Sequence, residues 1–213
     1  HFGMTQEAGI DSGIAQGQGF TVYANRTVLK RAHDVVGRIH QRVHISAMLP
    51  AHLVEGGNAH FQRGVTGTGT HAALPQLGRD AVVAGAQLVT ALQTIASRTV
   101  SPFDAAVVSV TQMHAGDTWN VIPEEVVLRG TTRAFKEETQ THMEAEIRRI
   151  TDGIAAAFGI EAKVHYERRY PPTINDAAET GLTVEVASEL VGADMVSLDK
   201  DPMMGAEDFA FML

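Results

Sequence analysis

The stretch GTGTHAALP, residues 67–75, is the most informative part of this chain. It follows a β-like run at residues 61–66 and ends at Pro75, just ahead of a helical pattern that begins near Arg79. Its two glycines predict a turn whose backbone adopts conformations that other residues avoid. A histidine held in such a turn can point its imidazole at a ligand, so His71 is a candidate functional residue, although a lone turn histidine is more often a bystander.

Working outward from this turn, hydrophobic periodicity predicts the rest of a domain. We expect strands at residues 61–66, 105–111, 125–133 and 162–169, with helices at 79–98 and 136–158. This β-α-β-β-α-β order is typical of a ferredoxin-like, four-stranded antiparallel sheet with two helices on one face. The apolar positions expected in its core are Leu88, Leu92, Ile95, Val108, Val110, Ile147, Ile150 and Ile154.

Turn and cap signals delimit these elements. Residues 114–117 predict a turn between two strands, and Gly159 predicts the end of the second helix. The chain changes character after Asn175. We expect a helix at residues 177–191, a strand-like segment at 195–198 and a turn leading into a helix at 202–213.

Composition excludes several classes of protein. The 213 residues carry 17 basic and 25 acidic side chains, and this net charge of −8 argues against a nucleic-acid partner. There is no cysteine, so disulfides and thiolate metal sites are excluded, and a reducing, cytoplasmic location fits. No apolar run approaches the length of a membrane span, so we expect no membrane partner.

Residues 1–65 give few clear signals. If residues 27–48 form a helix, His33, His40 and His44 share one of its faces. A metal site is one interpretation, but Gln41 stands where a zinc protease helix would carry its general base. A solvated polar face is the other interpretation.

Three phrases in the second half of the chain resemble a known family. GTGTHAALP at residues 67–75, NVIPEE at 120–125 followed by Arg133, and MMGAEDF at 203–209 occur in this order in the metal-dependent amidohydrolases. That family includes hippurate hydrolase, aminoacylase-like enzymes and the indole-acetyl-amino-acid hydrolases. The resemblance runs from about residue 65 to residue 213, roughly 70% of the chain.

The resemblance implies an enzyme with two domains. A larger α/β catalytic domain would hold two divalent metals, zinc or manganese, and a smaller βαββαβ lid would make a homodimer. On this basis residues 1–65 are a possible remnant of the catalytic domain, residues 66–172 are the lid, and residues 173–213 begin the return to the catalytic domain.

The resemblance also implies roles for four residues. His71 matches a catalytic histidine that reaches the partner subunit's site and stabilises the oxyanion, and Asn120, Arg133 and Glu207 match substrate-binding positions. Other roles remain open: Asn120 could cap the turn before Pro123, Arg133 could be a solvated strand end, and Glu207 could mark a helix N-terminus.

The chain departs from the family where metal ligands are expected. The family's Cys/His pair, its carboxylate phrase and its last histidine are not recognisable, and Thr5 follows a phrase that precedes a metal-binding histidine in the family. We therefore expect a fragment or divergent member of the hydrolases that cleave the amide bond of small N-acyl amino acids, with little activity of its own. The alternatives are a non-catalytic dimerisation or binding module and, least favoured, a histidine-rich metal-binding protein.

Overall fold

A computed structural model describes residues 54–198 and 201–212. Thr5 and the three histidines at positions 33, 40 and 44 lie outside this part of the chain. The chain divides into two compact units, and each is described by itself. One unit comprises residues 54–173 and 202–213, and the other contains α4 (Ala177–Val191), at the bounds that the sequence predicts.

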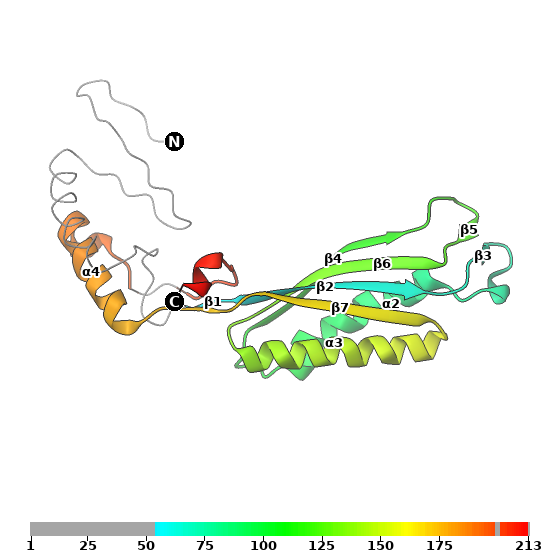
Figure 1. Cartoon of the computed structure of the whole chain (residues 1–213), viewed down its shortest axis with the longest axis horizontal. Helices are drawn as coiled ribbons and strands as arrows, with labels where there is room; N and C mark the ends of the chain where they lie inside the picture. The colour runs from blue at the N-terminus through cyan, green and yellow to red at the C-terminus, as the bar shows by residue number, and fades with distance from the viewer. Residues whose placement is uncertain (1–53, 199–200, 213) are drawn as a thin grey trace, which may run out of the picture. The chain divides into compact units, whose positions relative to one another are not determined.

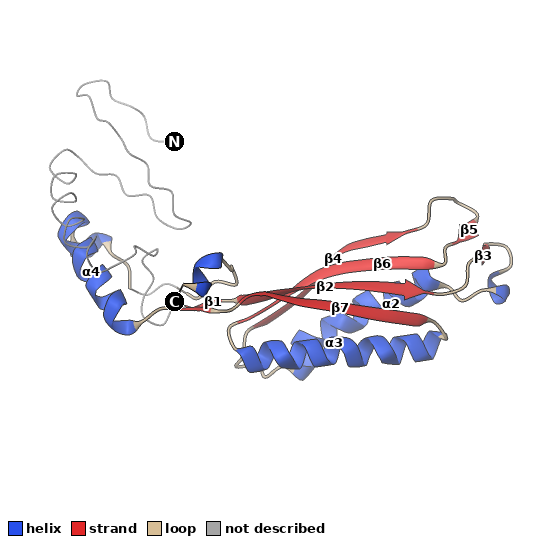
Figure 2. Ribbon diagram, viewed as in Figure 1, coloured by secondary structure: helices blue, strands red, loops and turns tan. Residues whose placement is uncertain are grey.

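The larger unit is built on a four-stranded antiparallel sheet. Its strands are β2 (Gly57–Thr66), β4 (Ala106–Ala115), β6 (Glu125–Ala134) and β7 (Glu161–Tyr170), in the spatial order β4-β6-β2-β7. Helices α2 (Ala81–Thr94) and α3 (Glu137–Phe158) cover one face of the sheet and leave the other face open (Figures 1 and 2). The predicted βαββαβ fold is confirmed.

The core lies between the sheet and these helices. Alternate residues of β2 and β6 point toward the helices, as a pleated strand with one buried face requires. Most of the predicted core positions are buried, whereas Val110 and Ile154 are only half-buried at its edge. The buried positions among those predicted are Leu88, Leu92, Ile95, Val108, Ile147 and Ile150.

Some predicted element bounds were too narrow or wrong. Strand β2 begins four residues earlier than expected, and β4 continues through His114 and Ala115, so that the turn is made at Gly116 with a φ of 62°. Asp80, whose carboxylate accepts hydrogen bonds from two backbone N–H groups, starts α2 after Arg79 rather than at it. The strand predicted at residues 195–198 is absent, because Met195 instead closes a 3-10 turn, η3 (Ala193–Met195).

The sheet unit also extends beyond the predicted limits of 66–172. Strand β2 lies between β6 and β7, so residues 57–66 are part of the sheet. The segment 202–212 joins the same unit: Gly56 N donates to Met203 O at 3.0 Å, and the rings of Tyr170 and Phe211 are 5.8 Å apart. Further short elements of the described residues are β1 (Val54–Glu55), β8 (Thr173–Ile174) and η4 (Asp208–Phe211). Within residues 54–198 and 201–212, every helix lacks the apolar length that a membrane span requires.

One arginine of β2 lies in the core, on the same face of the strand as the buried Phe61 and Val65. Arg63 of β2 is fully buried, and its Nη2 donates to Ile147 O of α3 at 2.5 Å. Within the described residues, Nε and Nη1 of Arg63 have no hydrogen-bond partner. Burial lowers the pKa of Arg63 to about 10, and Asp152 nearby offsets only part of that effect.

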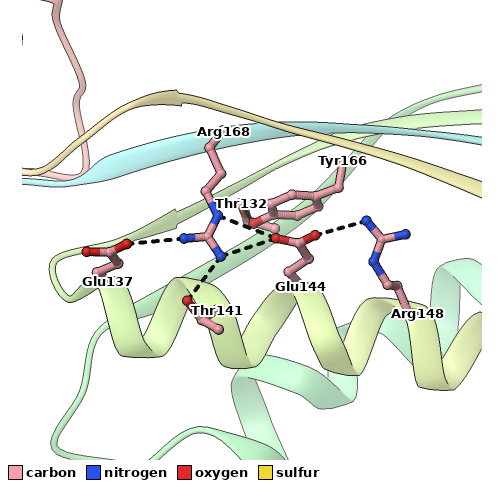
Figure 3. A network of polar contacts seen from close by, with 7 residues as sticks. All are labelled: Thr132, Glu137, Thr141, Glu144, Arg148, Tyr166 and Arg168. Atoms are coloured by element: carbon pink, nitrogen blue, oxygen red, sulfur yellow. Dashed lines mark hydrogen bonds and ion pairs between the residues drawn. The ribbon is translucent and has the colours of Figure 1, made fainter.

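A polar network ties β7 to α3 on the outer side of the core (Figure 3). Arg168 of β7 donates to Glu144 Oε2 at 3.2 Å and to Thr141 Oγ1 at 3.0 Å, and Arg148 donates to Glu144 Oε1 at 2.9 Å. Burial alone would raise the pKa of Glu144, but the hydrogen bonds from Arg148 and Arg168 outweigh it and hold that pKa below its ordinary value.

Glu144→Gln tests this network. We expect the free energy of unfolding to fall by about 1 kcal/mol at neutral pH, because the substitution removes the charge between two arginines. Since folding lowers the pKa of Glu144, its contribution is present above the unfolded pKa and is lost as pH falls through the folded pKa. Urea denaturation at several pH values should therefore show the difference disappearing in acid. Glu161→Gln, which removes a carboxylate with no ion pair among the described residues, is the control.

Candidate functional site

The first two family-like phrases meet at one end of the sheet. Strand β3 (Thr70–His71) pairs with β5 (Val121–Ile122), and His71 lies opposite Val121. Ala72 N also donates to Asn120 O at 2.9 Å. Figure 1 shows β3 and β5 extending past the ends of the long strands. We call residues 67–77 and 116–122 the tip.

The His71 side chain is exposed and held in a defined orientation. Ala73 N donates to Nδ1 of His71 at 3.1 Å. A neutral imidazole that accepts at Nδ1 carries its proton on Nε2, so this contact fixes the tautomer. Nε2 is therefore a hydrogen-bond donor available to a group outside the tip.

Gly67 and Gly69 are required for a different reason from the predicted one. Neither Gly67 nor Gly69 is among the positive-φ glycines, so the conformational argument is wrong. Instead, other chain segments approach too closely for a side chain. A Cβ on Gly67 would lie 2.0 Å from Arg79 O, and one on Gly69 would lie 2.9 Å from Glu124 Cγ.

Gly67→Ala should therefore displace the tip. Because the added methyl group meets a backbone carbonyl, we expect a loss of about 1–3 kcal/mol in the free energy of unfolding. Urea denaturation followed by far-UV circular dichroism measures this loss. Gly153→Ala is the control, since a Cβ there would meet nothing within 4 Å. Equal stability of the two variants would contradict the close approach.

The tip carries exposed apolar side chains that the sequence analysis did not single out. Trp119, directly before Asn120, is fully exposed, and Leu77 and Val121 are 66% and 48% exposed. Large exposed apolar side chains gathered in one place mark interaction surfaces. The signal was present in the sequence, because the only tryptophan stands beside a candidate site residue.

Arg133 and the third phrase lie together, but away from the tip. Arg133 is half-buried near the last residue of β6, and its Nη1 donates to Met204 O at 2.8 Å. Glu207 is exposed and directly precedes η4, with no side-chain capping bond. Eight strand residues at about 3.4 Å each separate Glu125, at the tip end of β6, from Arg133, which is roughly 27 Å.

The described residues hold no group of three or more His, Asp or Glu side chains that could bind a metal ion. The structure therefore brings His71 and Asn120 together, and Arg133 near the phrase containing Glu207. It does not join these two pairs within one chain.

A protein-family model for the peptidase dimerisation domain matches residues 55–157. Residues 55–157 belong to the M20 peptidase dimerisation family. The match covers strands β2, β4 and β6, helix α2, nearly all of α3 and the tip, so the resemblance to the metal-dependent amidohydrolases is confirmed.

Individual relatives agree with this assignment to the M20 family. N-acetyl-L-cysteine deacetylase of Bacillus subtilis is 40% identical over 72% of this chain and 36% of its own length. Hippurate hydrolase of Campylobacter jejuni is 37% identical over 69% of this chain and 38% of its own length. A Bacillus subtilis structure described as a dinuclear metal binding peptidase from the M20 family has a TM-score of 0.56 at 26% identity, covering 79% of this chain and 43% of that one. The chain thus spans less than half the length of each relative.

Proposed function

We propose that this chain forms the dimerisation domain, with adjoining segments, of an amidohydrolase that cleaves the amide bond of small N-acyl amino acids. The observation that carries the proposal is the exposed His71, held beside Asn120 on a tip that projects from an M20 dimerisation domain. The names of the relatives support the substrate class, since one acts on N-acetyl-L-cysteine and another on hippurate.

His71 would act on the transition state of amide hydrolysis. As water adds to the amide carbon, negative charge develops on the carbonyl oxygen. The Nε2–H that remains free in the fixed tautomer can donate to that oxygen, and a donor aimed at developing charge is worth about 3–4 kcal/mol. Asn120, on the same tip, would supply a second polar contact to the substrate.

The distance between His71 and Arg133 within one chain favours a site shared between two chains. His71 and Arg133 are separated by more than the length of β6, roughly 27 Å, which exceeds the length of a small N-acyl amino acid. Arg133 is suited to the substrate's carboxylate, because a guanidinium can pair with both oxygens. We propose that His71 and Asn120 of one chain complete a site to which the partner contributes Arg133 and its 203–209 phrase, with Glu207.

We expect the divalent metal in the whole enzyme, and not in the part of the chain that the structure describes. The similar Bacillus subtilis structure is described as dinuclear metal binding. No suitable cluster lies in residues 54–198 and 201–212, so zinc or manganese would be held by side chains elsewhere in the enzyme.

The two edge strands of the sheet differ in charge, and this difference favours one of them as the contact with the partner. Edge strand β7 contains five charged residues, whereas β4 has no Lys, Arg, Asp or Glu over ten residues. Helix α2, which packs beside β4, also lacks these residues. Natural proteins protect exposed edges with charge, so the uncharged β4 edge is suited to antiparallel pairing with a second copy.

Ser109→Lys tests this interface. Ser109 lies near the middle of β4, so the substitution would bring one positive charge from each copy to the paired edge, and we expect the dimer dissociation constant to rise at least about tenfold. His165→Lys, on the opposite edge strand, is the matched control and should leave it unchanged. Light scattering against concentration measures both. A monomeric wild-type chain at high micromolar concentration would contradict the proposed dimer.

The alternative, a non-catalytic dimerisation module, makes a different prediction. The amidohydrolase proposal expects the full-length protein to bind divalent metal and hydrolyse N-acetyl amino acids, with activity lost in a chelator and restored by zinc or manganese. Dimers without metal and without hydrolysis would support the alternative. We expect little hydrolysis by the 213-residue chain itself, because its described residues include no metal cluster.

A further inference from the structure

The face of the sheet opposite α2 and α3 is left open by the helices (Figure 2). This face contains a polar hollow of about 420 Å³. Side chains from all four strands line it. Cavities that bind small molecules start at roughly this size. The hollow lies along the middle of the sheet, with Arg133 at its border, and it does not include the tip.

One row of paired residues crosses the hollow. Gln112 of β4 lies opposite Arg129 of β6, Arg129 lies opposite Gln62 of β2, and Gln62 lies opposite His165 of β7. The β4 strand has a bulge between Val110 and Gln112, and both Thr111 and Gln112 line the hollow. Bulges of this kind redirect side chains and are common beside functional sites.

Arg129 is held in place without being neutralised. Its Nε donates to Gln62 Oε1 at 3.2 Å and its Nη1 to Gln112 Oε1 at 3.3 Å. Both acceptors are uncharged amides, and in the described part of the chain Nη2 has no partner. Glu167, the carboxylate that lines the hollow, forms an ion pair with Arg169 at 3.1 Å. A full positive charge therefore remains at Arg129, on a chain whose net charge is −8.

The neighbours of Arg129 add donors rather than acceptors. Because a guanidinium only donates, the oxygens of Gln62 and Gln112 must face it, and their NH₂ groups remain available to a ligand. His60 and His165 also line the hollow, whereas the hydroxyl of Thr111 donates to the backbone oxygen of Arg129 at 3.3 Å. An oriented guanidinium surrounded by donors is complementary to a carboxylate or a phosphate group.

We propose that this hollow binds a small molecule through a carboxylate or phosphate group, with Arg129 as the anchoring residue. Arg133, a substrate-binding residue of the proposed amide hydrolysis, also lines the hollow, but this proposal rests on Arg129 and uses neither the tip nor a metal. Arg129 is exposed, so its substitution should leave the fold intact. Binding can therefore be measured on the 213-residue chain itself.

The test is a titration of the chain with inorganic phosphate and, separately, with acetate, at constant ionic strength set with chloride. Heteronuclear NMR follows the backbone amides of Arg129, Gln62 and His165. We expect saturable shifts with at least one of the two anions, and the anion that saturates identifies the group recognised. Arg129→Gln should weaken that binding at least about tenfold, and Arg129→Lys should weaken it less.

Arg149→Gln is the matched control, since Arg149 lies on α3 and pairs with Glu146 at 2.7 Å. It should bind like the wild type. Two results would overturn the proposal: no saturable shift with either anion, or equal weakening by Arg129→Gln and Arg149→Gln. The latter would show that only the overall charge attracts the anion.

Discussion

His71→Ala is expected to lower the turnover rate of the full-length enzyme about 10²–10³-fold while leaving its metal content unchanged. The structure supports an effect on the turnover rate without an effect on the metal content. His71 stands on an exposed tip, its Nδ1 is occupied by Ala73 N, and no metal cluster lies near it in the described residues. Removing the imidazole should cost a donor to the transition state, so kcat should fall more than KM rises. Steady-state kinetics with an N-acetyl amino acid, together with elemental analysis, measure both quantities.

Two controls make this prediction specific. His142→Ala removes another exposed histidine, on α3, and should retain wild-type turnover. A mixture of His71→Ala with Arg133→Ala chains tests the shared site. If His71 serves the partner, mixed dimers should recover part of the activity, because one of their two sites has both residues intact. Recovery is not expected if each chain uses its own His71. Loss of metal from His71→Ala would instead indicate a ligand role.

The sheet and its helices could be predicted because their signals are local. The alternating residues of β6 and the apolar stripe of α2 follow from burial of one face, and the structure buries those faces. Strand ends were less predictable. His114 and Ala115 read as a turn, but β4 pairs with β6, which is also ten residues long, and continues along it as far as Ala115. The length of β4 is set by a pairing partner that is distant in sequence, so it cannot be predicted from the local composition.

The arrangement of the candidate site was only partly predictable. The phrases named His71, Asn120, Arg133 and Glu207, but only the sheet register shows that the first two lie far along β6 from Arg133. Gly67 was recognised for the wrong reason, since the approach of Arg79 depends on tertiary structure. Arg63 gave no sign of burial either. A charged residue in an alternating strand reads as exposed, and here the carbonyl of Ile147 accepts one of its hydrogen bonds inside the core.

Leu92→Ala should produce the largest loss of stability among these variants, about 2–5 kcal/mol in the free energy of unfolding. Leu92 is fully buried on the inner side of α2, within the core cluster that includes Leu88 and Ile95. Truncation removes apolar contacts and leaves a cavity that the surrounding sheet can close only in part. Urea denaturation at a fixed protein concentration gives the value, because self-association would otherwise shift the midpoint.

Leu77→Ala is the matched control for this truncation. Leu77 is 66% exposed on the tip, so the same change should alter stability by no more than about 0.5 kcal/mol. If the two truncations cost the same, α2 does not pack on the sheet as described, and the scaffold that positions the tip would need revision. If they differ as expected, the apolar stripe that indicated a helix in the sequence also fixes α2 on the sheet. Arg79, just before α2, pairs with Thr68 at the start of the tip, so the packing of α2 also helps to position His71.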